Sequence, residues 1–422
     1  MQATVYPSPV SGTVVVPPSK SFAHRAILCA ALAGGHSEVH NLTYSQDVRA
    51  TIEGMRALGA RIETHDTWAE IEGVPDLTAF AGGVVDCNES GSTLRFLIPL
   101  FAQCGRPVTF VGRNRLLQRP QTVYQEVFQE RGLSYAHRED GITIQGPLPA
   151  GEYVLAGDVS SQFISGLLFL LPLLPGDSVI RIRPPYESRS YVELTLQVME
   201  AFGVKASYKD PYTLCIPGGQ RYQATRYTVE GDYSQLAFFA VLGALFGQVT
   251  CLGVSQGSLQ GDGVILPILK RFGAQVQPVD GGFSIAKGDL TGGEIDLSDC
   301  PDLGPILTVL GAFSQGETHL SHAARLRYKE SDRAQAMETE LKKLGVTISS
   351  GEDDLYIRGN SSYEGGVAVD GHLDHRIVMS LAVAAMGCCQ PVTIGGAQAI
   401  EKSYPGFFTD FQQVGGKVVL EP

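Results

Sequence analysis

Two kinds of helical pattern alternate along the chain, one apolar on nearly every side and one with apolar residues on a single face. The second kind ends at a glycine that is followed by a short β-rich run, as in MRALGARIE and LKRFGAQVQ. The six glycines are Gly59, Gly132, Gly203, Gly273, Gly345 and Gly415. Because successive glycines are 70 to 73 residues apart, the pattern predicts six copies of one repeating structure.

The apolar helices keep the same spacing. Their polar starts are Ser19, Ser90, Ser160, Asp232, Asp302 and Asp374, each 40 to 43 residues before the glycine of its repeat. A turn and a β-rich run such as GDSVIRI follow the apolar helix, so each repeat is predicted to be apolar helix, strand, polar loop, amphipathic helix and strand. A helix as apolar as STLRFLIPLFA is expected to be buried, with sheets packed outside it.

Composition limits the classes of ligand. The 422 residues are 44% hydrophobic, which suits a globular protein of two domains or one large compound domain. A formal charge of -12 argues against a surface that follows nucleic acid or an anionic membrane, so an anionic ligand must meet locally concentrated positive charge.

The sequence indicates neither secretion nor a special role for the cysteines. The start MQATVYPSPV lacks the blocks of a signal peptide and the longest apolar stretches are too short to span a bilayer, so we expect a cytoplasmic protein. The cysteines form no CxxC pair, which indicates neither a disulfide framework nor a zinc site.

Candidate chemistry lies at the polar helix starts, because a helix N-terminus offers unpaired N–H groups to an anion. Serine and aspartate there are also ordinary N-caps. Capping does not explain Lys20, Arg25, Arg95 and Arg376, since positive charge opposes the helix dipole at this end. A bound phosphate or carboxylate would resolve the conflict.

The polar loops before the amphipathic helices repeat this cationic character. The segments are LLQRPQTV, ESRSYVEL, RLRYKESDRAQ and EKSYPGFF. Solvated surface charge would explain any one of them alone. Cations at equivalent points of several repeats favour a shared ligand site.

The segments PPSKSFAHRA, SGSTLRF, GDVSSQF, EGDYSQ, RLRYKESDR and VDGHLDHR resemble, in this order, the 5-enolpyruvylshikimate-3-phosphate synthase family. The resemblance covers essentially the full chain. It implies an α/β fold of two similar lobes, each of three βαβαββ units with buried helices inside and sheets outside, an inside-out α/β barrel. The helix N-termini would face a cleft between lobes that close on substrate.

The resemblance also implies that the chain passes between the lobes twice. We therefore expect a discontinuous lobe of residues 1–18 and 230–422 that carries the Asp and Glu acid-base residues. Residues 19–229 would form the lobe with the Ser-rich site for shikimate 3-phosphate.

Site residues follow from the matching motifs. Shikimate 3-phosphate would be held by Lys20, Ser21, Arg25, Ser160, Ser161, Gln162, Ser188, Tyr191, Asp302 and Lys329. Phosphoenolpyruvate would be held by Lys20, Gly91, Arg119, Gln162, Arg333, Arg376 and Lys402. Guanidinium groups suit its phosphate and carboxylate because they can bind both bidentately.

The implied reaction is transfer of the enolpyruvyl group to the 5-hydroxyl of shikimate 3-phosphate by addition and elimination, in the shikimate pathway of aromatic amino acid biosynthesis. Asp302 would take the hydroxyl proton and Glu330 would exchange the proton at C3, with Lys20 a competing candidate. Neither a metal nor an organic cofactor is implied. The protein would act as a monomer.

One segment departs from the family pattern. In CNESGSTLR, Glu89 lies two residues before Gly91, where many relatives carry Ala or Ser beside the glycine, which leaves the contacts of this turn and the response to glyphosate open. Arg325 likewise stands at a variable loop position.

Three alternatives fit the residues less well. UDP-N-acetylglucosamine enolpyruvyl transferase is disfavoured because Ser21 follows Lys20 where that family has Asn, and because LLQRP contains no Cys. RNA 3′-terminal phosphate cyclase fits poorly with the net charge. A non-catalytic anion-binding protein would not need Asp302, Glu330 and Lys20 beside the ligand cations.

Overall fold

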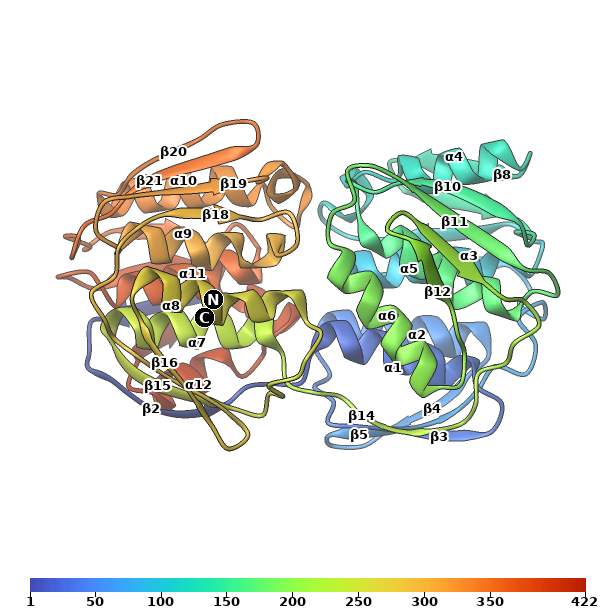
Figure 1. The fold of residues 1–422 in the computed structure, drawn as a ribbon, viewed down its shortest axis with the longest axis horizontal. Coiled ribbons are helices and arrows are strands. Elements are labelled where there is room, and N and C mark those ends of the chain that lie inside the picture. Colours follow the sequence, from blue (N-terminus) through green and yellow to red (C-terminus); the bar gives the residue numbers. More distant parts are fainter. The chain divides into compact units, whose positions relative to one another are not determined.

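The computed structural model describes residues 1–422, which form two compact units (Figure 1). Unit 1 consists of Met1–Pro17 and Gly231–Pro422, and unit 2 consists of Pro18–Glu230. The chain thus passes between the units twice. Pro18 and Glu230, which we expected in the discontinuous lobe, belong to unit 2 instead.

Unit 2 contains three repeats. The first comprises β14 (Arg226–Thr228), α1 (Lys20–Leu32), β3 (His36–His40), α2 (Gln46–Leu58), β4 (Arg61–Thr64) and β5 (Trp68–Glu72). The second comprises β6 (Gly83–Asp86), α3 (Gly91–Ala102), β7 (Val108–Val111), the 3-10 helix η1 (Leu116–Gln118), α4 (Thr122–Glu130), β8 (Ser134–Arg138) and β9 (Gly141–Gln145). The third comprises β10 (Glu152–Ala156), α5 (Ser161–Leu170), η2 (Leu171–Leu173), β11 (Ser178–Arg183), α6 (Arg189–Ala201), β12 (Ser207–Asp210) and β13 (Thr213–Ile216).

Unit 1 contains the other three repeats. One comprises β2 (Val10–Val15), α7 (Tyr233–Phe246), β15 (Gly247–Leu252), η3 (Gly261–Val264), α8 (Ile265–Phe272), β16 (Gln275–Val279) and β17 (Gly282–Ala286). The next comprises β18 (Glu294–Asp296), η4 (Pro301–Leu303), α9 (Gly304–Ala312), β19 (Glu317–Ser321), η5 (Ala324–Tyr328), α10 (Arg333–Leu344), β20 (Thr347–Ser350) and β21 (Asp354–Arg358). The last comprises β22 (Ala368–Asp370), α11 (His375–Ala385), β23 (Val392–Gly395), η6 (Ala397–Lys402), α12 (Phe407–Gln413), β24 (Lys417–Glu421) and β1 (Gln2–Tyr6).

Each repeat forms one four-stranded sheet with the same strand order and directions, although β1, β2 and β14 reach their sheets from distant parts of the chain. In the sheet β10-β11-β13-β12, for example, β10 and β11 are parallel and are joined through α5, while the other neighbours are antiparallel. A parallel pair requires such a crossover, whereas the last two strands form a hairpin. The predicted six repeats and the βαβαββ order are therefore confirmed.

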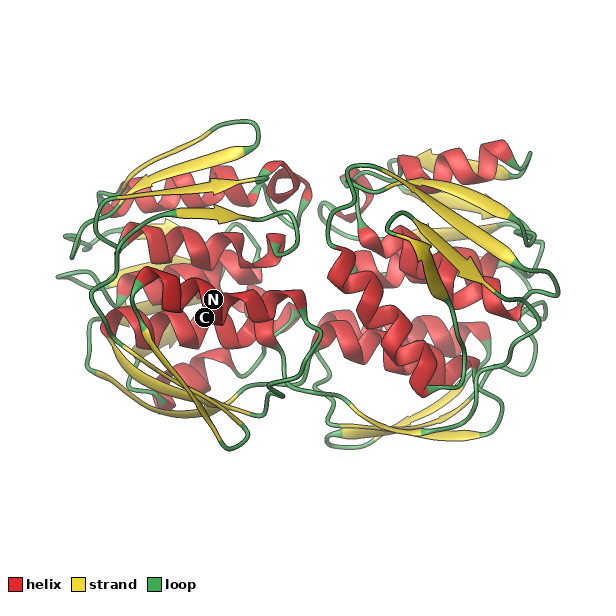
Figure 2. Ribbon diagram, in the orientation of Figure 1, coloured by secondary structure: helices red, strands yellow, loops and turns green.

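The apolar helices lie inside their unit and the strands lie on its outside, as Figure 2 shows. In α7, all residues from Tyr233 to Leu245 are buried. Each unit has its own hydrophobic core. Because an enclosed helix excludes water from its sides, its polar N-terminus is the part that remains available to a ligand.

The helix ends largely agree with the sequence pattern. All six repeat glycines have a positive φ, between 65° at Gly132 and 116° at Gly59, a conformation that glycine adopts without steric cost. Side-chain caps are formed by Ser19, Ser90, Ser160, Asp232 and Asp374. Asp302 is different, because it lies within η4, and α9 begins at Gly304 without a side-chain cap.

None of the helices combines the length and the apolarity that a membrane span needs. All eight cysteines are free thiols.

Candidate active site

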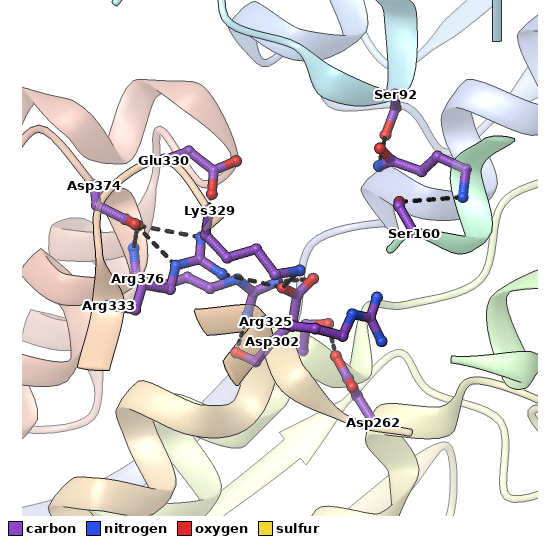
Figure 3. A network of polar contacts seen from close by, with 12 residues as sticks. Ser92, Ser160, Asp262, Asp302, Arg325, Lys329, Glu330, Arg333, Asp374 and Arg376 are labelled. Atoms are coloured by element: carbon purple, nitrogen blue, oxygen red, sulfur yellow. Dashed lines mark hydrogen bonds and ion pairs between the residues drawn. The ribbon is translucent and has the colours of Figure 1, made fainter. Parts of the chain in front are cut away.

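Asp302 is the centre of a charged network in unit 1 (Figure 3). Its Oδ1 lies 3.0 Å from Nζ of Lys329 and 3.1 Å from Nη1 of Arg333, and its Oδ2 lies 3.3 Å from Nη2 of Arg376. Arg376 also donates from Nη1 to the backbone carbonyl of Asp302 at 3.0 Å. The carboxylate that the sequence placed as a cap therefore faces three cations instead.

The helix starts of unit 1 bring these groups together. Lys329 follows η5, Arg333 is the first residue of α10, and Arg376 lies in the first turn of α11. Asp302 comes earlier than the helix it was expected to cap because Gly304 and Pro305 begin α9, and proline suits a first turn.

Arg333 is almost completely buried, at 1% exposure, and its guanidinium pairs with acidic side chains. Its Nε lies 2.8 Å from Asp374 and its Nη2 donates to Glu330 at 2.7 Å. Burial by itself lowers the pKa of Arg333, but Asp374, Glu330 and Asp302 outweigh it and raise the pKa above the usual value. Arg333 is thus a permanent cation that orients three carboxylates, those of Asp302, Glu330 and Asp374.

Glu330 belongs to the same charged network through Arg333. Its side chain is mostly buried, its Oε2 accepts from Arg333, and Nζ of Lys402 lies 3.8 Å from its Oε1. Lys402 is the last residue of η6 and is itself buried. Glu330, Arg333 and Lys402 therefore meet, as the matching motifs implied.

Protonation states follow from burial and neighbouring charge. Burial raises the pKa of Asp302, but Arg376, Lys329 and Arg333 together overcome it and hold the pKa well below its usual range. Burial lowers the pKa of Lys329 to about 8, opposed by Asp302 and reinforced by Arg325. The network therefore holds an ionised Asp302 beside a lysine that titrates near neutral pH.

Asp262 is a buried carboxyl that the sequence reading did not select. It lies in η3 and hydrogen-bonds to Ser234 in the first turn of α7. Burial, followed by the negative charge of Asp302, raises its pKa to about 6. Its segment SLQGDG carries no cation, so nothing in the sequence marked Asp262 as a candidate site residue.

Unit 2 presents a second set of polar side chains. Arg95 donates from Nη1 to Oε1 of Gln162 at 2.7 Å, and Gln162 donates from Nε2 to Oγ of Ser92 at 2.9 Å. Ser92 and Ser160, both labelled in Figure 3, belong to the starts of α3 and α5. The Ser-rich starts of two repeats therefore share one hydrogen-bond network.

Two predicted residues lie at one turn of unit 2. A Cβ placed on Gly91 would lie 2.9 Å from Nη1 of Arg119, which shows how closely the guanidinium approaches the backbone. Arg119 is mostly buried. Glu89, the unusual acid of this turn, accepts a hydrogen bond at 2.7 Å from Asn114.

Lys20 and Arg25 have structural partners on neighbouring helices. Nζ of Lys20 lies 2.7 Å from Asp47 of α2, a residue that the sequence reading missed. Arg25 donates to Oγ1 of Thr195 and to the carbonyls of Ser21 and Tyr191. Arg25 thus joins α1 to α6 and fixes Ser21 and Tyr191, whatever it contributes to a ligand.

Serines 161 and 188 are also helix-start residues. Ser161 is the first residue of α5 and is buried. Ser188 precedes α6 in a left-handed conformation with φ of 51°, and its side chain does not cap the helix. The serines of unit 2 therefore stand at helix starts, as Arg333 and Arg376 do in unit 1.

This combination of a repeated fold with helix-start cations and acids defines the enolpyruvyl transferase class. The structure of the enolpyruvyl transferase NikO from Streptomyces tendae has the same fold, with a TM-score of 0.79 at 15% identity over 99% of this chain and 98% of that one. An EPSP synthase from Acinetobacter baumannii is similar at 27% identity, with a TM-score of 0.80 over 99% of this chain and 100% of that one.

The chain belongs to the EPSP synthase (3-phosphoshikimate 1-carboxyvinyltransferase) family, whose model matches residues 5–411. A 3-phosphoshikimate 1-carboxyvinyltransferase from Clostridium perfringens is 45% identical over 415 residues, which cover 98% of both chains. One from Clostridium acetobutylicum is 44% identical over 419 residues, covering 98% of this chain and 97% of the relative.

Proposed function

We propose that the chain transfers the enolpyruvyl group of phosphoenolpyruvate to the 5-hydroxyl of shikimate 3-phosphate, with release of phosphate, as its family membership implies. The observation that carries the residue assignment is the ionised Asp302 among Lys329, Arg333 and Arg376, with Glu330 on the same arginine. A base and a second proton-transfer group lie within one network of cations. Such a network suits two anionic substrates that must exchange protons.

Phosphoenolpyruvate is assigned to the cations that flank the carboxylates. Arg333 and Arg376 of unit 1, with Lys402, and Arg119 of unit 2, with Lys20, supply guanidinium and ammonium groups for its phosphate and carboxylate. Gly91 gives Arg119 its close approach to the backbone. Gln162, bonded to Arg95, supplies an amide to the same ligand.

Shikimate 3-phosphate is assigned chiefly to unit 2. Hydroxyl groups of Ser160, Ser161 and Ser188 suit the 3-phosphate because they donate at helix starts, where the dipole also favours an anion. Ser21, Arg25 and Tyr191 are tied together by the Arg25 hydrogen bonds, so they form one preorganised side of this site. Lys329 and Asp302 would meet the hydroxyl groups of the ring.

The assigned reaction has two steps. Asp302 takes the proton of the 5-hydroxyl of shikimate 3-phosphate while the hydroxyl oxygen attacks C2 of phosphoenolpyruvate. At the same time C3 gains a proton from Glu330 or Lys20. The tetrahedral adduct then loses phosphate as C3 gives a proton back, which restores the double bond. No net oxidation or reduction occurs.

Substrate binding also adjusts Asp302 for its role. In this structure the cations hold its pKa low, which makes it a weak base. A phosphate or carboxylate that shares Arg333, Arg376 and Lys329 partly cancels their charge, and the pKa of Asp302 then rises toward a more useful value. The base is therefore activated when the anions are bound.

The test is to mix purified protein with shikimate 3-phosphate and phosphoenolpyruvate and to follow inorganic phosphate and the enolpyruvyl product. Release that depends on both substrates is the expected result. Release with UDP-N-acetylglucosamine in place of shikimate 3-phosphate would favour the alternative transferase, and binding without release would favour a non-catalytic anion-binding protein.

A monomer in the cytoplasm stays our prediction. Small-molecule substrates suffice for the reaction, and no partner chain is needed to supply a site residue. Light scattering at the concentration of the assay measures the oligomeric state, and a dimer would contradict the prediction.

A further inference from the structure

A row of three glutamates crosses the outer face of the sheet β14-β3-β5-β4 in unit 2, whose strands are labelled in Figure 1. Glu70 of β5 lies directly opposite Glu38 of β3 on one side and Glu63 of β4 on the other. Like charges directly opposite each other on neighbouring strands destabilise a sheet. Positive charge close to these glutamates would therefore stabilise the sheet.

Only part of that compensation comes from side chains. Glu38 is paired with His40, whose Nε2 lies 2.7 Å away, and with Arg226 at 3.5 Å. Glu70 has only the exposed ring of His36, with 3.5 Å between Nδ1 and Oε1. Glu63 makes neither a side-chain hydrogen bond nor an ion pair. The repulsion between Glu63 and Glu70 is thus left without a cationic side chain between them.

The imidazole of His65 lies beside Glu63 and Glu70. His65 continues the alternation of β4, so it shares the outer face with Glu63, and its ring stacks on Trp68 at 4.0 Å between centroids with 18° between planes. Its backbone N–H donates to the carbonyl of Trp68 at 2.8 Å, which fixes the chain where it turns into β5. Its Nε2 is hidden from solvent and makes no hydrogen bond.

One ligand atom from each of Glu63, His65 and Glu70 lies within 4.8 Å of the others. We propose that these three side chains bind a zinc ion on the outer face of the sheet, with a water molecule as the fourth ligand. Carboxylate and imidazole ligands in a four-coordinate set suit Zn²⁺, whereas Mg²⁺ prefers oxygen ligands in an octahedron. The ion supplies the missing positive charge and links β4 to β5.

The proposed site is separate from the transfer reaction, because none of its residues is assigned to either substrate. Its effect is on the stability of unit 2. A ligand that binds the folded state alone raises the stability in proportion to the logarithm of its concentration. Zinc is therefore expected to raise the melting temperature without changing turnover.

The experiment titrates Zn²⁺ into chelator-treated protein, using a chromophoric chelator as competitor for affinity and stoichiometry. The expected result is one zinc ion per chain, bound at least about tenfold more weakly in His65→Gln and in Glu70→Gln. Glu63→Gln changes an exposed residue, so it provides a second measurement if His65→Gln is poorly folded. Mg²⁺ at the same concentration is expected to produce no shift in melting temperature.

The matched control is His319→Gln, which removes another surface histidine between two carboxylates, with Glu294 and Asp354 both 2.6 Å from its ring. This variant is expected to keep its zinc. The proposal is overturned if His65→Gln and Glu63→Gln bind zinc as the parent protein does, or if His319→Gln alone loses it. It is also overturned if no zinc binds to the parent protein.

Discussion

Oδ1 of Asp302 lies 3.0 Å from Nζ of Lys329, and each group changes the acidity of the other. Lys329 helps to keep Asp302 ionised. Burial lowers the pKa of Lys329 to about 8, and the negative charge of Asp302 opposes a larger fall. In the proposed reaction the carboxylate accepts a proton while the ammonium holds the acceptor. The pair therefore joins substrate binding to proton transfer.

Replacing Asp302 with Asn is expected to lower kcat by about 10² to 10⁴, because the amide cannot accept the hydroxyl proton. The binding of both substrates should change far less, since Asn retains the shape and leaves the cations in place. Steady-state kinetics together with direct binding measurements separates the two effects. Asp299→Asn, which alters an exposed carboxylate three residues away, is the matched control. Equal turnover in the two variants would remove the role assigned to Asp302.

The acidity of Lys329 predicts an alkaline limit on activity. Because burial lowers its pKa to about 8, the ammonium loses its proton as pH rises through that value, and kcat/KM for shikimate 3-phosphate should fall above it. Lys329→Arg keeps a positive charge at any accessible pH, so its profile should extend to higher pH even if its activity is lower. The exposed Lys270→Arg is the control and should leave the profile where it is. An unchanged alkaline limb in Lys329→Arg would assign that limb to another group.

Gly91→Ala is expected to raise the KM for phosphoenolpyruvate by about tenfold or more, with a smaller change in kcat. The new Cβ would lie 2.9 Å from Nη1 of Arg119, and the end of that flexible side chain would move aside. Stability should hardly change, because no backbone atom must shift. Gly34→Ala is the control, since nothing lies within 4 Å of its new Cβ. If both variants have the parent KM, Arg119 does not hold phosphoenolpyruvate as proposed.

The repeat was predictable from the sequence because its signals are local. A glycine after an amphipathic helix is required where the chain takes a positive φ, and Gly59, Gly273 and Gly345 are the terminal caps of α2, α8 and α10. The polar starts were equally clear in five repeats. Such features depend only on neighbours in the chain, so one sequence contains them.

The exceptions have two kinds of cause: the position of Asp302 depends on neighbouring prolines, whereas the other two depend on groups far apart in the chain. Asp302 is preceded by a proline, and a second proline follows at 305, so its segment forms a short 3-10 turn before α9. Asp47 pairs with Lys20 across 27 residues, and neither α1 nor α2 contains a motif that indicates the pair. The glutamates of β3, β4 and β5 likewise meet through strand register, which a list of residues does not show.

The buried pair of Asp374 and Arg333 predicts a dependence of stability on pH. Burial raises the pKa of Asp374, but the charge of Arg333, the charge of His375 and the hydrogen bond from Arg333 together outweigh it and lower the pKa to about 2. The folded pKa is below the unfolded one, so the stabilisation is complete above about pH 4 and is lost as pH falls toward 2. Asp374→Asn is therefore expected to lower the free energy of unfolding at pH 7 by about 2 to 4 kcal/mol.

Urea unfolding of the parent and of Asp374→Asn between pH 7 and pH 3 measures this difference. Asn still caps α11, so the loss reports the missing charge beside Arg333 rather than a lost cap. The gap between the two proteins should be constant from pH 7 to about pH 4 and should narrow below it, because protonation then removes the same charge from the parent. Asp280→Asn, an exposed carboxylate of the β16-β17 turn, should follow the parent throughout. A gap that stays constant down to pH 3 would show that the charge of Asp374 is not its source.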